Sequence, residues 1–185
     1  MFIIDMPITQ ILNFDQELMK LINTGMSNPF FDQLMIFITH LGSPYFWLLV
    51  GLTLLIKKKV SAIGIAIGLA VNAVASLGIK ALFMRSRPGD VLEGIKTLVV
   101  ETDSSFPSAH TSTAFLGAVV LSYYYPKGKP FFYGLAALIA VSRIYVGVHF
   151  PLDVIVGAVL GLLVGKWVLT LPLTKYSKKY GFTRK

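Results

Sequence analysis

The chain has 185 residues, 55% of them hydrophobic and only 14% charged, and its mean hydropathy is +0.70. Soluble domains carry about 25% charged residues, so this composition excludes an ordinary soluble protein and indicates an integral membrane protein. The formal net charge of +8 does not indicate a nucleic-acid partner, because the basic residues form short clusters between apolar runs, a pattern that orients membrane helices.

The first predicted element is an amphipathic helix within residues 1–28. Apolar residues recur there near helical spacing, with charged residues among them: Ile8, Ile11, Leu12, Leu18, Leu21 and Ile22. Such a helix suits the membrane interface. The chain does not open with a basic segment, an apolar stretch and a cleavage site, so we expect no removable signal peptide. Asn28 and Pro29 are expected to end this helix and begin the next.

Residues 29–171 are predicted to form a bundle of transmembrane helices, since about 20 helical residues cross a hydrocarbon core. Five apolar runs are long enough or nearly so: Leu34–Ile56, Val60–Phe83, Ser108–Tyr125, Phe131–Val148 and Leu152–Leu171. The first run contains a break at His40, Gly42 and Pro44, so it is either one kinked span or two shorter helices. No linker divides the chain, and the expected fold is therefore one all-α domain of five to six transmembrane helices, with a basic tail at 172–185.

The lysine clusters predict the orientation of this bundle. Basic residues lie between the first and second spans, between the third and fourth spans, and after the last: Lys57, Lys58, Lys59, Lys127, Lys129, Lys175, Lys178, Lys179, Arg184 and Lys185. If the spans alternate, all of these lie on one side, which the positive-inside rule makes cytoplasmic. We therefore expect the C-terminus to lie on the cytoplasmic side of the membrane. The other ionisable clusters, between Lys80 and Asp153, then fall on the outer face.

That outer face has the chemistry of an anion site. Helices that begin near Pro107 and Pro151 would direct their N-termini toward it. The backbone N–H groups of Ser108 and Ala109 would then attract an anion. Three cationic side chains join them: Lys80, Arg87 and Arg143. Because a guanidinium can bind two phosphate oxygens at once, the pattern predicts a phosphoryl-binding pocket.

Small residues recur every four positions on two of the predicted helices. They are Gly64, Gly68, Asn72 and Ser76 on the second span, and Gly157, Gly161 and Gly165 on the last. Small residues at this spacing let helices approach closely in lipid. Lys80 and Asp153 continue the two series, so we expect both to lie on packed faces rather than toward lipid.

Two histidines and one carboxylate are the candidate catalytic groups. A neutral imidazole can attack phosphorus if a carboxylate holds its second nitrogen, and Asp153 follows His149 by one helical turn. His110 can protonate the leaving oxygen. Because the cations already stabilise the phosphate oxygens, we expect no metal or other cofactor, and the sequence has no cysteine to supply thiolate ligands.

Three motifs resemble, in order, the signature of the type 2 phosphatidic acid phosphatase superfamily. KALFMRSRP at 80–88 fits KxxxxxxRP, PSAH at 107–110 resembles PSGH, and SRIYVGVHFPLD at 142–153 fits SRxxxxxHxxxD. That family includes membrane lipid phosphatases, glucose-6-phosphatase and vanadium haloperoxidases. The motifs cover under half of the chain, and the hydropathy layout extends the resemblance over nearly all of it. Ala109 departs from the glycine of the family, and its methyl group would be strained at a positive φ.

The resemblance implies a phosphohistidine mechanism. His149 would be the nucleophile, Asp153 would orient it, and His110 would protonate the leaving group and later activate water. The implied phosphate ligands are Lys80, Arg87, Ser108 and Arg143, with the backbone of Ala109. The implied substrate is a phosphomonoester or pyrophosphate of a membrane lipid. Undecaprenyl pyrophosphate is the first candidate, followed by phosphatidylglycerol phosphate, phosphatidic acid and lipid A phosphate.

Several roles stay open at this stage. A phosphotransferase would use the same phosphohistidine, a haloperoxidase would bind vanadate in the same pocket, and a transporter would only hold an anion there. Arg85 is interpreted as an interface anchor or headgroup contact, and His40 as structural. The loop at 89–106 is either a mobile lid or solvated surface, and the sequence leaves the oligomeric state open.

Overall fold

The computed structural model describes residues 8–173, 175 and 181–183. Within these residues the fold is all-α, with eight α-helices and one short 3-10 helix. The helices are α1 (Ile8–Asn23), α2 (Pro29–His40), α3 (Pro44–Ile56), α4 (Val60–Phe83), α5 (Pro88–Val91), α6 (Ala109–Tyr124), η1 (Pro126–Gly128), α7 (Lys129–Tyr145) and α8 (Pro151–Thr170). The all-α prediction is therefore confirmed for the described part of the chain.

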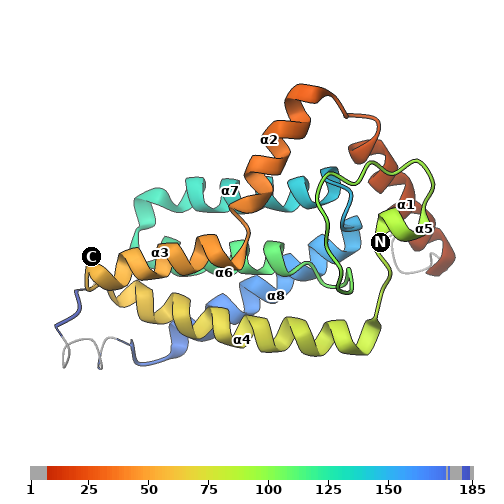
Figure 1. The fold of residues 1–185 in the computed structure, drawn as a ribbon. Helices are drawn as coiled ribbons and strands as arrows, with labels where there is room; N and C mark the ends of the chain where they lie inside the picture. The colour runs from red at the N-terminus through yellow and green to blue at the C-terminus, as the bar shows by residue number, and fades with distance from the viewer. Residues whose placement is uncertain (1–7, 174, 176–180, 184–185) are drawn as a thin grey trace, which may run out of the picture.

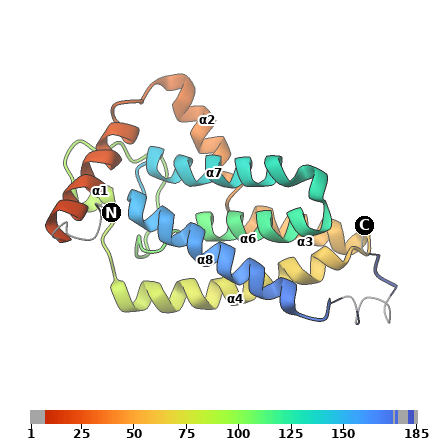
Figure 2. The same cartoon turned by 180° about the vertical axis from the view of Figure 1, so that it is seen from behind.

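Helix α6 lies inside the bundle and packs against α4, α7 and α8. Figure 1 shows that the α3–α4 connection, η1 and the end of α8 gather at one end of the bundle. The α4–α6 and α7–α8 loops gather at the opposite end, beside α1 and α5 (Figure 2). The lysines of the first two connections thus lie far from the motif-bearing loops, as the alternation of the predicted spans requires.

The first predicted span is two helices rather than one. Asn28 caps α2, where its side chain accepts a hydrogen bond from the Phe31 amide (3.0 Å), and Pro29 occupies the first turn. Ser43 caps α3 in the same way, and the two helices meet at 52°. The break at 41–43 has a plain cause, because proline at position 44 cannot continue the hydrogen-bond ladder of α2.

The number of clear spans is smaller than predicted. By length and composition, two helical stretches of the described chain can cross a membrane, Val60–Val91 and Pro151–Thr170, and the bent α2–α3 pair makes a third if it counts as one span. Helices α6 and α7 have only 16 and 17 residues. Helix α6 begins and helix α7 ends at the motif-bearing end of the bundle. They are less apolar because they carry buried polar residues, among them Thr111 and Arg143.

The small-residue series lies on the packed faces, as predicted. All of its members on α4 and α8 are buried, and so are Lys80 and Asp153, which continue it. A Cβ at Gly157 would lie 2.5 Å from the carbonyl oxygen of Ser108, and one at Gly161 would overlap that of Ser112. The backbones of α6 and α8 therefore touch, which holds the starts of both helices at the same end of the bundle.

The inner face of α1 is more polar than its sequence pattern suggests. Its buried residues are Asp15, Met19 and Asn23, whereas Ile8 and Leu21 are exposed. The polar side chains turn inward because they find partners there, and Asn23, for example, donates to the carbonyl oxygen of Tyr145 (2.6 Å). The position of α1 at a membrane interface stays a prediction, as does the single domain. Most of the predicted basic tail lies outside the described residues.

Substitution of Gly161 by alanine should destabilise the protein by about 1–3 kcal/mol, because the added methyl group forces the α6 and α8 backbones apart. Gly78→Ala on α4 is the matched control, since a Cβ there meets nothing within 4 Å. The control should leave stability unchanged or slightly higher. The measurement is the thermal unfolding midpoint of both variants in the same detergent. Equal midpoints would show that this helix contact is not tight.

Candidate active site

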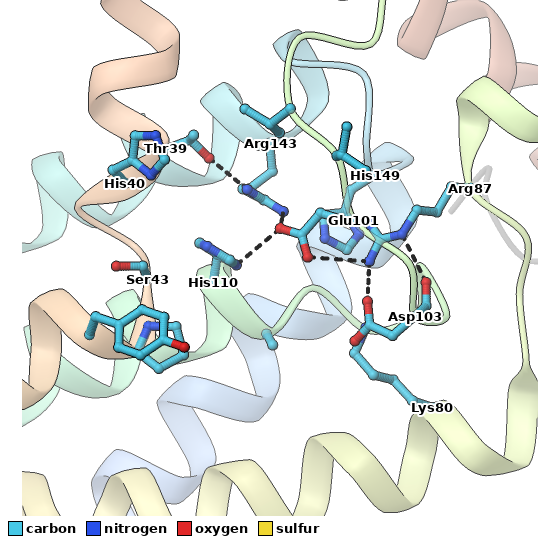
Figure 3. A pocket seen from close by; sticks show the side chains of 15 residues that line it. Thr39, His40, Ser43, Lys80, Arg87, Glu101, Asp103, His110, Arg143 and His149 are labelled. Carbon is cyan, nitrogen blue, oxygen red and sulfur yellow. Dashed lines mark hydrogen bonds and ion pairs between the residues drawn. The ribbon is translucent and has the colours of Figure 1, made fainter.

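A cavity of about 540 Å³ opens at the motif-bearing end of the bundle. Six of the eight predicted site residues line it: Lys80, Arg87, Ala109, His110, Arg143 and His149. They come from α4, the segments before α5 and α8, and helices α6 and α7, as Figure 3 shows for the labelled side chains. The other two, Ser108 and Asp153, are fully buried behind the wall. Residues up to 70 positions apart thus meet at one place.

His149 lies on the cavity wall just before α8 and is 2% exposed. Its Nδ1 atom is 3.6 Å from Oδ2 of Asp153, which is too long for a hydrogen bond, and Nδ1 has no hydrogen-bond partner among the described residues. The same carboxylate oxygen accepts the amide of Phe150 at 2.9 Å instead. The carboxylate therefore lies beside the imidazole as predicted, but the expected hydrogen bond is not made in this arrangement.

Ser108 lies behind the cavity wall, where its amide and its hydroxyl oxygen both have partners, and its role as a phosphate ligand stays a prediction. Its amide donates to the carbonyl oxygen of Asp153 (3.0 Å), and its hydroxyl oxygen accepts from the hydroxyl of Thr111 (3.0 Å). Ser108 thus caps α6 with its hydroxyl oxygen and ties that helix to α8 through its amide. Ala109, the first residue of α6, does line the cavity. It is not among the residues with positive φ, so the methyl group causes no backbone strain there.

The three predicted cations lie together, and the two arginines each have a hydrogen-bond partner outside the α5–α6 loop. Arg143 is 1% exposed and donates to the hydroxyl of Thr39 (2.8 Å). Arg87 donates to the carbonyl oxygen of Val148 (2.8 Å). These bonds leave further N–H groups of both guanidinium groups for an anion. The positions of the two guanidinium groups are therefore fixed before any substrate enters, which is the arrangement that stabilises developing negative charge best.

Two carboxylates of the α5–α6 loop occupy the space among these cations (Figure 3). Glu101 accepts from Nη2 of Arg143 at 2.6 Å. Asp103 pairs with Arg87, and its other oxygen is 3.1 Å from Nζ of Lys80. The loop at 89–106 is thus more than solvated surface, because it places two anions where the predicted phosphate would bind.

Arg85 was misinterpreted in the sequence and Asp15 was missed, and both lie beside the site. Arg85 is not an interface anchor, since its Nη1 atom pairs with Oδ1 of Asp153 at 2.5 Å. Its Nη2 atom pairs with Asp15 of α1 at 2.7 Å. An acidic residue within the apolar pattern of α1 was the available signal for Asp15, but nothing in the sequence names its partner. His40 lines the cavity without a resolved role.

His149, the predicted nucleophile, is held as a neutral imidazole. Burial lowers the pKa of the His149 imidazole well below its ordinary value of 6.5, and the charges of Arg143, Arg87 and Lys80 lower it further. A neutral imidazole has a free electron pair at one nitrogen, which nucleophilic attack requires. His110 lies across the cavity, with its Nδ1 atom 4.0 Å from Glu101.

Comparison with known proteins agrees with this site. A family model described as the PAP2 superfamily matches residues 60–177, which include all eight predicted site residues. The undecaprenyl-diphosphatase of Sulfolobus acidocaldarius is 37% identical over 164 residues, which cover 86% of this chain and 77% of that protein.

Two solved structures have the same fold. The crystal structure of Aquifex aeolicus LpxE matches with a TM-score of 0.80 and 33% identity, and the match covers 92% of this chain and all of that one. A Bacillus subtilis transmembrane PAP2-type phosphatidylglycerolphosphate phosphatase matches with a TM-score of 0.75 and 25% identity, over 87% and 85% of the two chains. The similarity therefore extends over most of this chain, α1 to α8.

The neutral state of His149 can be tested by ¹⁵N NMR of histidine-labelled protein, with its signals identified by their loss in His149→Gln. The ring should be neutral at pH 6.5, where an unperturbed histidine is half protonated. Since the unfolded chain takes up this proton below pH 6.5 and the folded chain does not, the contribution of His149 to stability is present above pH 6.5 and is lost as the pH falls. Half protonation at pH 6.5 in the folded protein would contradict the assignment.

Proposed function

The chain belongs to the PAP2 superfamily and is a membrane lipid phosphatase, and from this premise we propose that it releases phosphate from a lipid pyrophosphate or phosphomonoester through a phosphohistidine on His149. Undecaprenyl pyrophosphate is the first candidate substrate, because the relative from Sulfolobus acidocaldarius is named for that activity. Phosphatidylglycerol phosphate is the second, from the name of the Bacillus subtilis protein. Phosphatidic acid and lipid A phosphate are the further candidates.

One observation carries the proposal: the cavity lined by three cations and by the two candidate catalytic histidines, His110 and His149, shares a wall with an apolar groove. The groove has a volume of about 500 Å³ and lies between α3 and α4. The shared lining residues are Pro44, Lys80, Asp103 and Ala109. A phosphate at the cations would therefore place its attached hydrocarbon chain beside the groove.

The groove suits a chain that stays in the bilayer. Its walls are mostly small or aliphatic side chains, and Leu48 and Leu77 at its sides are 59% and 63% exposed on the outer surface of the bundle. Apolar surface of this kind is expected to face lipid in a membrane protein. A lipid phosphate can thus approach from the side, without leaving the bilayer.

The first chemical step would transfer the phosphoryl group to the enzyme. A ring nitrogen of His149 attacks phosphorus, a P–N bond forms, and the P–O bond to the lipid breaks. His110 gives a proton to the departing oxygen. The cations Lys80, Arg87 and Arg143 stabilise the three equatorial oxygens, and contacts outside the α5–α6 loop hold the two arginines in place for that role.

The second step would return the enzyme to its starting state. His110 takes a proton from water, the water oxygen bonds to phosphorus, and the P–N bond to His149 breaks. Inorganic phosphate leaves. If an alcohol attacks in place of water, the same intermediate makes the enzyme a phosphotransferase. Analysis of the products formed with a candidate acceptor distinguishes hydrolysis from phosphoryl transfer.

Substrate binding would require an exchange of anions. Glu101 and Asp103 pair with the same three cations that the phosphate needs. The phosphate oxygens replace these carboxylates, and the loop that carries them moves aside. The two arginines keep contacts outside this loop, with Val148 and Thr39, whereas Lys80 donates to the loop carbonyl of Ser104 and would lose that bond when the loop moves.

The distribution of charge supports an outward-facing site. The lysines of the α3–α4 connection and of η1–α7 lie at the end of the bundle opposite the cavity (Figure 1). The positive-inside rule makes the lysine end cytoplasmic. We infer a site on the outer face of a bacterial inner membrane and a cytoplasmic C-terminus.

The function is tested with purified protein and a panel of lipid phosphates, measuring released phosphate in detergent. Undecaprenyl pyrophosphate should be hydrolysed best, and activity should persist in EDTA because the cations of the chain neutralise the phosphate. His149→Ala should lower turnover by at least about 10³-fold, since loss of a nucleophile removes the covalent route. Gly78→Ala is the folded control. Failure to hydrolyse any lipid phosphate would refute the function, and full turnover by His149→Ala would refute the nucleophile.

The exchange of anions predicts the effect of two loop substitutions. Glu101→Gln and Asp103→Asn should each lower KM about fivefold, because each removes a partly exposed ion pair worth about 1 kcal/mol that competes with the substrate. Glu93→Gln is the matched control in the same loop, and it should leave KM unchanged because Glu93 is exposed away from the cavity. A rise in KM for the first two variants would show that their carboxylates help to bind substrate.

A further inference from the structure

A buried chain of charges connects α1 to the carboxylate beside His149. Asp15 is 1% exposed and Asp153 is fully buried, and Arg85 lies between them. Its guanidinium group is 2.5 Å from Oδ1 of Asp153 and 2.7 Å from Oδ2 of Asp15. One arginine is thus shared by two carboxylates from opposite ends of the sequence.

The contact with Arg85 constrains how Asp153 can turn. Because Arg85 holds Oδ1, the other oxygen is left for the amide of Phe150 and for the ring of His149. The guanidinium group also lies 4.0 Å from the centre of the Phe150 ring, the residue after His149. A rotation that took Oδ2 away from the imidazole would break the pair with Arg85.

Asp15 in turn constrains Arg85. Its Oδ1 atom accepts the amide of Leu152 in the first turn of α8 (2.8 Å), and its Oδ2 atom holds Arg85. Helix α1 is therefore joined to the start of α8, the helix that carries Asp153. Burial of a carboxylate is costly unless it is paired and hydrogen-bonded, and here both oxygens are used.

We propose that Arg85 and Asp15 are positioning residues for the catalytic step, with Arg85 fixing the Asp153 carboxylate against His149 and Asp15 fixing Arg85. The proposal rests on the proposed function. Neither residue lines the cavity, so neither contacts the phosphate. Asp15 also lies outside the matched family region of 60–177, so α1 contributes to the reaction from beyond that region.

The contact between Arg85 and Asp153 matters most when His149 attacks phosphorus. The His149 ring gains positive charge when it attacks phosphorus, and a carboxylate held beside Nδ1 stabilises that charge. A carboxylate free to turn toward other donors stabilises it less. Loss of Arg85 should therefore slow the phosphoryl transfer and leave phosphate binding, which depends on the three cavity cations, nearly unchanged.

The test compares kcat and KM of Arg85→Gln, Arg85→Lys and Asp15→Asn with the wild type, on the best lipid substrate of the panel. Outer residues that orient a catalytic group contribute about 10–100-fold, so kcat should fall by about 100-fold for Arg85→Gln and about 10-fold for the other two. KM should stay within about twofold. Arg85→Lys retains the charge and serves if Arg85→Gln does not fold, but it cannot reach both carboxylates at once.

A double mutant separates the proposed path from unrelated losses. Because Asp15 acts through Arg85, Asp15→Asn should lower kcat no further in the Arg85→Gln background. Independent effects would multiply instead. Multiplied losses would overturn the order of the two residues in the proposal.

Asn23 provides a control for the docking of α1. It is a second buried polar residue of α1, and its side chain bonds the backbone of Lys96 and Tyr145, away from Asp153. Asn23→Ser should lower the thermal unfolding midpoint about as much as Asp15→Asn but leave kcat within about twofold. A loss of kcat equal to that of Asp15→Asn would show that α1 acts only through stability and would overturn the proposal.

The outcomes also separate this inference from the function itself. If the wild type is active, His149→Ala is inactive and Arg85→Gln has full kcat, the positioning role is wrong and the function stands. If Arg85→Gln raises KM at unchanged kcat, Arg85 contacts the substrate and the positioning role is again wrong. If the wild type releases no phosphate from any lipid, the proposed function fails first.

Discussion

The burial of positive charge inside an apolar bundle is the constraint on which the site depends. Lys80, Arg87 and Arg143 are nearly buried, and an unpaired buried charge costs several kcal/mol. Each cation therefore has an anionic partner, and the α5–α6 loop supplies the carboxylates of Glu101 and Asp103. Under the proposed function, binding of a lipid phosphate would replace one set of anions by another, rather than fill an empty pocket. The buried cations are compatible with the fold because the carboxylates of Glu101 and Asp103 neutralise them in the absence of substrate.

The glycines of α8 allow the starts of α6 and α8 to lie side by side at the cavity. Without side chains at Gly157 and Gly161, the α8 backbone reaches the α6 backbone, and the amide of Ser108 bonds the carbonyl oxygen of Asp153. The starts of the two helices are thereby locked together. His110 lies in the first turn of one helix, and His149 directly precedes the other. A packing motif far from the chemistry thus determines the separation of the two candidate catalytic histidines.

Much of this could be predicted from local sequence patterns. The all-α fold, the break before Pro44 and the packed faces of α4 and α8 follow from apolar length, proline chemistry and four-residue spacing. The gathering of the motif residues at one end follows from alternating helices. The partners of single side chains do not follow, because contacts such as Arg85 with Asp15 join residues 70 positions apart through the docking angle of α1. The use of the Ser108 amide by Asp153 was hidden for the same reason.

Two arginines separated by one residue, Arg85 and Arg87, hold the segment around His149 from both sides. The chain leaves α4 at Met84 and has no helical hydrogen bonds at 85–87, so the side chains of Arg85 and Arg87 can separate. Arg87 bonds the backbone of Val148, just before His149, and Arg85 packs on Phe150, just after it. Arg87 faces the cavity, whereas Arg85 faces the buried carboxylates of Asp15 and Asp153. The segment at 85–87 therefore joins the cations of the cavity to the carboxylate beside the His149 imidazole. Movement of His149 would therefore have to disturb both arginines at once. This is how the α7–α8 loop, which has no regular structure around His149, can hold the proposed nucleophile in place.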